Sequence, residues 1–290
     1  MGLLRKLRVN YRLLFNTFCK IDLMERHTKL LVDFEIEKYI RHLHEEPRYS
    51  DPKRLNKYGL RVYSQCGEDG IVAEIFRRVG AANKYFVEIG TGDGLENNTA
   101  YLLLQGWKGY WVDANRAFTD KIGVNFNHQI RSGQLCLKNA SVNMKNVENL
   151  FADAKVPQEF DLLSIDIDGN DYWVWKAIEK YNPRVVVIEY NATYPPGISW
   201  VMKYNPKYSN NVSSYFGASL YSLVSLGNKK GYQLIGCTSS GVNAFFVRED
   251  LVKDRFCEPY TDSNHYEPPR YFLINRNTGH ARAFGEYESV

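Results

Sequence analysis

The sequence has no apolar run long enough for a membrane-spanning helix or a signal peptide. Its first segment carries arginines close to Leu3 and Leu4, and the apolar stretches that follow are interrupted by Arg8, Asn10 and Arg12. A spanning helix needs about 20 predominantly apolar residues, and a signal peptide needs an unbroken apolar core of about 7 to 15. We therefore predict a cytoplasmic protein without a transmembrane segment.

Cysteines are few, and their spacing follows no pattern. The five are Cys19, Cys66, Cys136, Cys237 and Cys257. Their odd number argues against a complete set of intramolecular disulfides, and no two of them have the close spacing of a zinc site. This usage predicts reduced thiols.

Neither sign of charge dominates the chain. It has 37 Lys and Arg against 33 Asp and Glu, a formal net charge of +4. Nucleic-acid-binding domains usually carry a strong basic field, so we predict a small-molecule or glycan substrate and no nucleic-acid partner. With 44% hydrophobic residues, the 290-residue chain can bury the core of one large α/β domain with extensions.

What the chain does contain is an apolar strand that leads directly into a glycine-rich turn. Residues 85–89 (YFVEI) precede residues 90–94 (GTGDG), and Asp113 ends the next apolar run. Glycines permit positive φ and close approach of the backbone to a ligand. An acid about 20 residues further on is placed to accept hydrogen bonds from ribose hydroxyls. The combination predicts an adenosine site, against the alternative of an ordinary strand-to-helix turn.

The spacing of the glycines indicates which adenosine cofactor binds. A nicotinamide fingerprint reads G-x-G-x-x-G, and here its third glycine is replaced by Leu95. Instead, Gly94 comes one residue early and Glu88 precedes Gly90 by two, a pattern typical of S-adenosylmethionine (SAM) binding. We predict SAM as the cofactor.

From Gly67 onward, helical and strand patterns alternate, which indicates a largely parallel sheet. The unbroken apolar run Val185–Ile188 is typical of a central strand buried on both faces. Residues 232–235 and 243–247 flank a turn and read as a hairpin. The prediction is a Rossmann-like, seven-stranded, mostly parallel sheet with helices on both faces and a C-terminal antiparallel hairpin. Predicted strands span 85–89, 109–112, 135–137, 160–165 and 184–190; predicted helices span 69–79, 98–105, 142–152, 172–181 and 218–228.

Acidic residues follow two of the predicted central strands. Asp166 and Asp168 follow the fourth strand, and Glu189 and Asn191 lie at the end of the fifth. In open α/β sheets the ligand lies outside the carboxyl ends of the strands, and clustered oxygen ligands suit Mg²⁺. Methyl transfer to a hydroxyl needs a base or a metal to help remove the proton. We therefore predict Asp166, Asp168 and Glu189 as catalytic residues and, with Asn191, as Mg²⁺ ligands; the alternative is a helix cap or bonds to backbone amides, above all for Asp171.

Six stretches of the chain match the motifs of one enzyme family: Tyr63-Ser64-Gln65-Cys66-Gly67-Glu68-Asp69-Gly70, Phe86-Val87-Glu88-Ile89-Gly90, Asp93-Gly94, Asn98-Thr99, Gly106-Trp107-Lys108-Gly109 and Asp166-Ile167-Asp168-Gly169. On these residues the chain resembles the FkbM-like SAM-dependent methyltransferases over about residues 60–250. The family's fourth-strand motif commonly reads Ile-Asp-Val-Glu-Gly-x-Glu, so Asp168 and Asp171 replace two glutamates with shorter acids. The resemblance implies O-methylation of a sugar, a nucleotide-linked sugar or another hydroxylated metabolite. It also implies cofactor contacts from Gln65, Glu88, Gly90, Asn98, Asp113, Ala140 and Ser141. We predict further cofactor contacts from Thr91, Gly92 and Asp166.

The two ends of the chain lie outside the resemblance. We predict an N-terminal helical cap and linker (1–58), a SAM-binding methyltransferase domain (59–257) and a C-terminal tail (258–290). The cap either packs on its own domain or on a second subunit, which would make a homo-oligomer, or lies weakly on an anionic membrane surface. Arg270, Arg276 and Arg282 make the tail either a lid over a phosphorylated substrate or a solvated face. His265 and His280 are competing candidates for the base.

Other classes of function remain open at this point. Asp166-Ile167-Asp168 matches the D-x-D motif with which metal-dependent glycosyltransferases hold a nucleotide sugar. That alternative leaves the glycine loop and Asp113 without a role. A nicotinamide oxidoreductase and a noncatalytic binding module are further alternatives, and the acids at the strand ends argue against the latter.

Overall fold

The computed structural model describes residues 2–208, 213–274 and 279–290, with side chains from Thr17 onward. The chain divides into two compact units, Met1–Glu46 and Pro47–Val290. The first unit consists of α1 (Gly2–Glu45), a continuous helix of 44 residues, as the helical pattern predicts. Many of its apolar side chains are exposed, among them Phe18, Met24 and Leu30.

Within the described part of the chain, no helix has the length and apolar character needed to cross a membrane.

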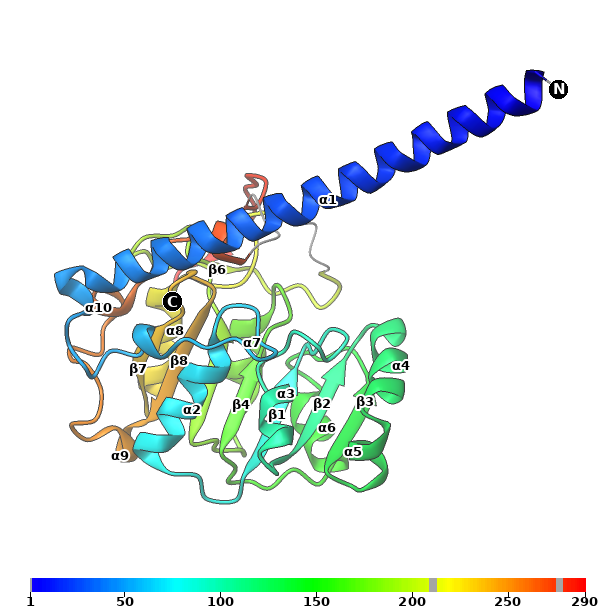
Figure 1. The fold of residues 1–290 in the computed structure, drawn as a ribbon. Helices are drawn as coiled ribbons and strands as arrows, with labels where there is room; N and C mark the ends of the chain where they lie inside the picture. The colour runs from blue at the N-terminus through cyan, green and yellow to red at the C-terminus, as the bar shows by residue number, and fades with distance from the viewer. Residues whose placement is uncertain (1, 209–212, 275–278) are drawn as a thin grey trace. The chain divides into compact units, whose positions relative to one another are not determined.

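The second unit is built around a seven-stranded sheet with the order β3-β2-β1-β4-β5-β8-β7 (Figure 1). Strands β1 to β5 are parallel, and β8 runs antiparallel to both β5 and β7. This confirms the predicted mostly parallel sheet with a C-terminal hairpin. The strands are β1 (Tyr85–Ile89), β2 (Lys108–Asp113), β3 (Leu135–Asn139), β4 (Leu162–Ile165), β5 (Val185–Glu189), β7 (Tyr232–Cys237) and β8 (Asn243–Arg248).

The strand order places a crevice at the centre of the sheet. The chain proceeds from β1 outward to β2 and β3, and then returns to the other side of β1 with β4 and β5. The loops that follow β1 and β4 therefore separate in opposite directions. Open α/β sheets bind their ligands at such a reversal, outside the carboxyl ends of the strands.

Helices cover both faces of the sheet, and each face has its own hydrophobic core. Val185 and Val187 of β5 belong to the core under α2, α3 and α4, and Val186 and Ile188 belong to the core under α6, α7 and α8. All four are fully buried, as predicted for a central strand. Burying such a side chain contributes about 1.5–3 kcal/mol. The helices are α2 (Glu68–Val79), α3 (Ala100–Leu104), α4 (Arg116–Asn125), α5 (Asn127–Arg131), α6 (Val147–Asp153), α7 (Asp171–Ala177), α8 (Leu220–Lys229), α9 (Glu249–Val252) and α10 (Asp262–His265).

The segment whose prolines and charges predict a linker is packed into the second unit. It forms two short 3₁₀ turns, η1 (Pro47–Tyr49) and η2 (Asn56–Tyr58). Tyr49 and Leu55 are each only 1% exposed. The prolines and charged residues of this segment therefore belong to short turns that pack on the hydrophobic core of the second unit.

The segment between β5 and α8, which we call the insertion, pairs with the C-terminal tail. β6 (Val201–Met202) and β9 (Tyr287–Glu288) form a two-stranded antiparallel sheet. The tail also contains a short 3₁₀ turn, η3 (Tyr271–Ile274). Of the three tail arginines, Arg276 lies outside the described residues.

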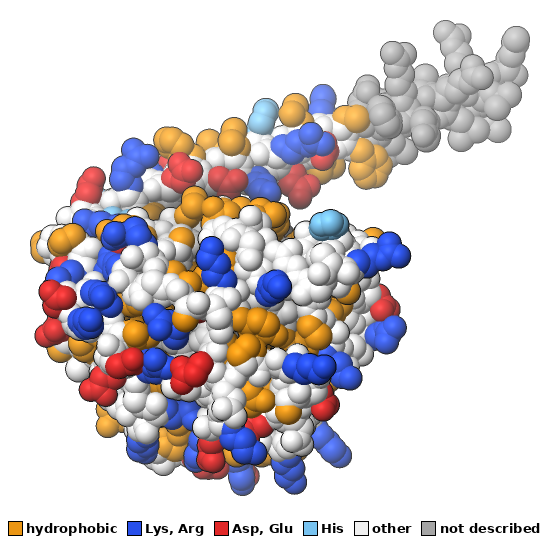
Figure 2. All heavy atoms as spheres, turned by 90° about the horizontal axis from the view of Figure 1, so that it is seen from below, with side chains coloured by type: hydrophobic (Ala, Val, Ile, Leu, Met, Phe, Trp, Pro, Cys, Tyr) orange, Lys and Arg blue, Asp and Glu red, His pale blue; other side chains and the backbone are white. Residues whose placement is uncertain are grey.

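Charged side chains of both signs are interspersed on the surface. Figure 2 shows lysine and arginine side chains scattered among acidic and apolar ones on the face drawn, without one concentrated basic area. This distribution accords with the small net charge of +4.

Candidate functional site

A cavity of about 790 Å³ lies at the carboxyl ends of β1, β2, β4 and β5. Its size is within the range of about 300–1,000 Å³ that is typical of ligand sites. The fold brings to it every predicted site residue except Asn191. The predicted residues that line it are Gln65, Glu88, Gly90, Thr91, Gly92, Asn98, Asp113, Ala140, Ser141, Asp166, Asp168 and Glu189.

Two glycines of the loop after β1 are required for different reasons. Gly90 has a φ of 83°, and a Cβ there would lie 1.7 Å from the carbonyl oxygen of Asp166. β1 and β4 could not come this close with any other residue at position 90. Gly94 has a φ of 82°, and a Cβ there would lie about 3 Å from Trp111 and Phe126. The early third glycine therefore serves close packing of the loop on the β2 core.

Asp113, the predicted ribose-binding acid, also holds the glycine loop. Its Oδ2 accepts hydrogen bonds from the backbone N–H groups of Thr91 (3.0 Å) and Gly92 (2.9 Å), and its Oδ1 accepts from Asn115 N–H (2.7 Å). A carboxylate offers about four lone-pair sites, so these bonds leave capacity for a ribose hydroxyl. The residue fits the predicted role and fixes the loop at the same time.

Glu88 positions the segment that follows the glycine loop. Its side chain is buried, Oε1 accepts from Asn98 N–H at 2.8 Å, and Oε2 accepts from the Thr99 hydroxyl at 2.5 Å. Asn98 in turn donates to Ser164 Oγ of β4 at 3.0 Å. Burial raises the pKa of Glu88 to about 7. Gln65 lies exposed on the lining, where it bonds Glu96 Oε2 at 3.0 Å.

Three carboxylates converge on the opposite side of the cavity. One oxygen each from Asp166, Asp168 and Glu189 lies within 4.8 Å of the others. The pKa values of Asp166 and Glu189 are raised well above their usual range, first by burial and then by the negative charge of their neighbours. Such a set gains either from taking up a proton or from binding a cation. The oxygen chemistry and the short separations fit a divalent metal ion.

The turn that carries Asp168 is shaped by Asp171. Asp168 has a left-handed φ of 57°, which aspartate tolerates better than most residues. Asp171 is fully buried and accepts hydrogen bonds from the N–H groups of Ile167 and Gly169, both at 2.8 Å. Burial raises the pKa of Asp171 to about 6. As the alternative for Asp171 predicts, this acid bonds backbone amides.

Asn191, predicted as a metal ligand, is not among the residues that line the cavity in the described structure. Its amide is buried and donates to the carbonyl oxygens of Ser214 (3.0 Å) and Phe216 (2.9 Å), while its Oδ1 accepts from Thr193 N–H. The side chain is used to hold the insertion against β5. The candidate metal ligands are therefore Asp166, Asp168 and Glu189, without Asn191.

The two tail histidines have different surroundings. His265 is buried, its Nε2 lies 3.0 Å from the carbonyl oxygen of Cys257, and burial lowers its pKa to about 3. It is a neutral structural residue away from the cavity. His280 lines the cavity, where its ring contacts the edges of Tyr271 and Phe216 at centroid distances of 4.9 and 5.0 Å. Burial lowers the pKa of His280 as well.

Sequence reasoning missed several lining residues, including Glu68, Asn243 and Tyr271. Glu68 is fully buried and accepts a hydrogen bond from Asn243 Nδ2 at 2.8 Å. Asn243 begins β8 and lies opposite Glu189 in the register of β5 and β8. Glu68 stood within a recognised stretch of sequence, but only the strand order brings Asn243 to the site.

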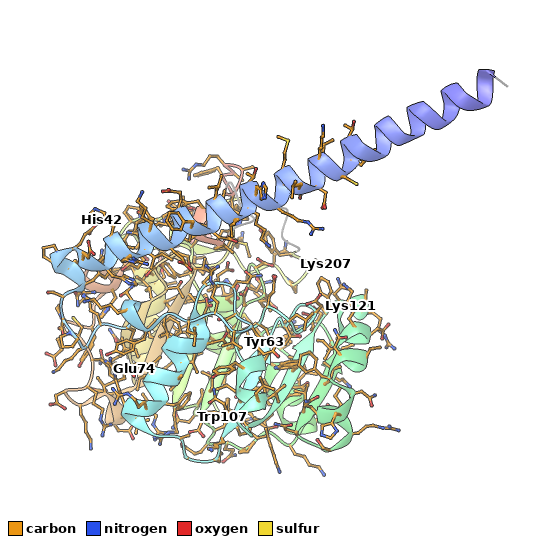
Figure 3. All side chains as sticks on the ribbon, in the orientation of Figure 1. His42, Tyr63, Glu74, Trp107, Lys121 and Lys207 are labelled. Carbon is orange, nitrogen blue, oxygen red and sulfur yellow. The ribbon has the colours of Figure 1, made fainter. Side chains whose placement is uncertain are left out.

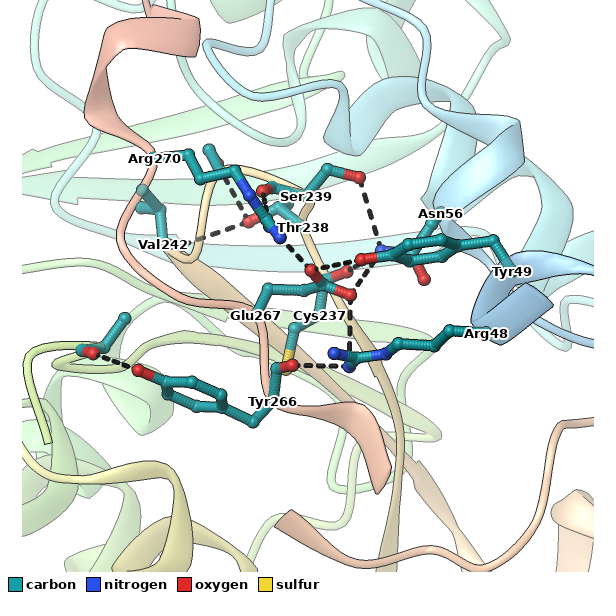
Figure 4. Close-up of polar contacts among 12 residues, drawn as sticks. Arg48, Tyr49, Asn56, Cys237, Thr238, Ser239, Val242, Tyr266, Glu267 and Arg270 are labelled. Carbon is teal, nitrogen blue, oxygen red and sulfur yellow. Dashed lines mark hydrogen bonds and ion pairs between the residues drawn. The ribbon is translucent and has the colours of Figure 1, made fainter. Parts of the chain in front are cut away.

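A buried ionic cluster around Glu267 lies shortly before Tyr271 in the tail, and Figure 4 shows its contacts. Glu267 Oε2 accepts from Tyr49 OH (2.8 Å) and pairs with Arg270 (2.7 Å), and Glu267 Oε1 accepts from Asn56 Nδ2 (3.2 Å). Arg48 lies 3.3 Å from the same Oε1. The cluster ties the residues just before Tyr271 to the 47–58 segment.

No protein-family model and no curated protein sequence matches the chain. Solved structures resemble it in part. An O-methyltransferase from Bacillus cereus in complex with SAH has 15% identity, 56% of this chain matched to 66% of that one, and a TM-score of 0.33. A SAM-dependent methyltransferase from Thiobacillus denitrificans in complex with S-adenosyl-L-homocysteine has 12% identity, 62% matched to 70%, and a TM-score of 0.37.

A third similar structure is the methyltransferase domain of the bacterial protein CtHen1-C. It has 17% identity, 63% of this chain matched to 97% of that one, and a TM-score of 0.39. All three superpose on this chain only in part.

Proposed function

We propose that the protein is a SAM-dependent O-methyltransferase that resembles the FkbM-like enzymes and acts on a hydroxyl of a sugar or related metabolite. The observation that carries the proposal is the division of one cavity into two halves. The glycine loop and Asp113 form one half, and the carboxylates of Asp166, Asp168 and Glu189 form the other. The first half suits an adenosine cofactor and the second suits activation of a hydroxyl.

The residues of the first half would hold SAM. Asp113 has capacity for the ribose, Gly90 keeps the backbone close, and Ala140 and Ser141 extend the wall beside Asp113. SAM supplies a methyl group on a positively charged sulfonium, which the many acids of the lining attract. Glu88 and Asn98 act on the cofactor side chiefly by holding the loop in place.

The residues of the second half would act on the acceptor. A hydroxyl has to lose its proton as it attacks the methyl group, and a positioned base contributes about 10²- to 10⁴-fold to the rate. Asp168 is the carboxylate of the three that solvent reaches most freely, so it is our candidate for the base. Asp166, Asp168 and Glu189 would hold Mg²⁺, which lowers the pKa of a bound hydroxyl when present. Alignment of the two substrates in the cavity would supply much of the remaining reduction of the barrier.

Thermal unfolding with different ligands tests the proposal. S-adenosylhomocysteine at about one hundred times its Kd should stabilise the protein by about 2.7 kcal/mol and raise Tm by several degrees. NAD should have no effect. A shift with NAD and none with S-adenosylhomocysteine would refute the proposal, and a shift with UDP-glucose that needs Mg²⁺ would support the glycosyltransferase alternative.

Two variants separate the halves of the site. Asp113→Ala should weaken binding of S-adenosylhomocysteine, because it removes both the ribose acceptor and the clamp on the loop. Asp168→Asn should leave that affinity unchanged and weaken binding of Mn²⁺, measured by calorimetry as a stand-in for Mg²⁺. Asp250→Asn, at an exposed position on α9, serves as the control for both. Unchanged Mn²⁺ binding by Asp168→Asn would remove Asp168 from the metal set.

A further inference from the structure

Six buried polar atoms that no hydrogen bond satisfies within the described residues belong to side chains that line the one cavity. Leaving a buried donor or acceptor unpaired costs free energy, and beside a cavity a ligand or a water molecule can supply the missing partner. Thr91 and Asn97 lie on the cofactor half. The other four belong to the opposite half. The atoms are Thr91 Oγ1, Asn97 Nδ2, Glu189 Oε2, Asn243 Oδ1, Tyr271 OH and His280 Nδ1.

The four atoms of the acceptor half require a ligand that both donates and accepts hydrogen bonds. Asn243 is only 3% exposed, and its Nδ2 is used by Glu68, so its free Oδ1 accepts. A carboxylate oxygen of Glu189 accepts as well, whereas the Tyr271 hydroxyl and the His280 ring do either. Hydroxyl groups meet all these needs. The oxygens of a fully ionised phosphate only accept, and they offer nothing to Asn243.

The charge of the lining also argues against a phosphorylated acceptor. Eight carboxylates line the cavity, and among its lining residues as described there is no lysine or arginine. Arg270 of the tail pairs with Glu267 and donates to Ser239 O. Arg282, whose positive charge acts on Tyr271, is exposed and is not among the described residues that line the cavity. Lys121 and Lys207 lie at this edge of the sheet in Figure 3, but Lys121 faces Asp93 at 3.7 Å and Lys207 is exposed.

We propose that Asn243, Tyr271 and His280 form, with Glu189, a subsite for an uncharged polyhydroxylated acceptor, and that the subsite rejects its phosphorylated form. The assignment rests on the proposed function, since it takes the glycine-loop half of the cavity for the cofactor. It adds Asn243 and Tyr271, which the sequence motifs do not indicate, and it gives His280 a binding role. It also narrows the acceptor class from sugars and sugar phosphates to neutral glycosides.

Saturation-transfer NMR on the full chain with bound S-adenosylhomocysteine tests this subsite. The probes are the methyl α-glycosides of glucose, galactose and mannose, with glucose 6-phosphate as the charged counterpart. We expect saturation of the protons of at least one glycoside and no saturation of the protons of glucose 6-phosphate. Tyr271→Phe should lower the affinity for the glycoside about 2- to 10-fold, which is the effect of losing one neutral hydrogen bond. The variant should fold normally, because its hydroxyl has no protein partner to lose among the described residues.

A control variant and the possible outcomes separate the subsite from the proposed function. Tyr221→Phe, an exposed tyrosine of α8, should bind the glycoside as the unmodified chain does. Saturation of the cofactor's adenine protons without saturation of any glycoside would overturn the subsite and leave the proposed function standing. Absence of the adenine signals together with absence of the thermal shift with S-adenosylhomocysteine would overturn both the subsite and the proposed function. If glucose 6-phosphate is saturated as strongly as the glycosides, the assignment of a neutral acceptor is overturned. If Tyr271→Phe binds the glycoside with unchanged affinity, the assignment of Tyr271 to the subsite is overturned.

Discussion

Asp113, Asp168 and Asp171 follow strands in the same sheet, but their surroundings give them different tasks. Asp113 bonds three backbone N–H groups and closes the glycine loop, and Asp171 bonds two and shapes the turn that carries Asp168. Asp168 itself is exposed to the cavity. At this scale the sequence predicts most of the residues that gather at the site, because strand ends converge, but it wrongly includes Asn191 and misses Asn243. The sequence does not predict which acids accept hydrogen bonds from backbone N–H groups.

The raised pKa of Glu88 predicts a specific dependence of stability on pH. Burial raises this pKa from 4.5 to about 7 in the folded protein. Between these values the native state binds more protons than the unfolded state, so the free energy of unfolding falls as pH rises through this window. Above pH 7 the loss is complete. A shift of this size corresponds to about 3 kcal/mol, and Glu88→Gln should remove that part of the decline.

Urea unfolding of both proteins at pH 5 and pH 7.5 measures this difference. The pKa values of Asp166, Asp171 and Glu189 are raised in the same direction, so the Glu88→Gln variant should retain the part of the decline that these acids cause. Parallel curves for the two proteins would show that Glu88 does not titrate within the window.

At the scale of elements, apolar patterns predict most strands and fewer helices. The run Val185–Ile188 is recognisable as β5 because every residue in it is buried. The helices α4 and α5 are absent from the sequence-based prediction, since α4 buries only Thr119 and Ile122 and α5 buries none of its residues. Amphipathic patterning is weak where a helix covers an edge of the sheet. The pairing of β6 with β9 joins segments about 85 residues apart, and local sequence carries no signal for it.

The buried Glu267 cluster predicts a large loss of stability when its carboxylate is removed. Glu267→Ala leaves Arg270, Tyr49 and Asn56 without their common acceptor in a buried place. Breaking such a pair from one side costs about 3–5 kcal/mol, which urea unfolding followed by circular dichroism would detect. Glu286→Ala is the matched control, because Glu286 pairs with Lys203 at an exposed position and surface pairs contribute little. Equal stability of the two variants would contradict the structural role of the cluster.

At the scale of the whole molecule, the division of the chain differs from the one its composition suggests. Prolines and charges after Glu46 predict a linker that ends at residue 58, yet Leu55 belongs to the hydrophobic core and Asn56 bonds Glu267. The compact unit begins at Pro47. Burial depends on contacts with residues about 200 positions away, and no local pattern reports them.

Two truncations test where the folding unit begins. The chain 47–290 contains both hydrophobic cores and every residue that lines the cavity. It should fold and bind S-adenosylhomocysteine with the Kd of the full chain, measured by calorimetry. The chain 59–290 keeps the same cavity residues but loses the core residue Leu55 and the hydrogen bonds that Tyr49 and Asn56 donate to the buried Glu267. We expect it to be insoluble or to unfold at much lower urea, and equal stability of the two truncations would place the boundary at residue 59 after all.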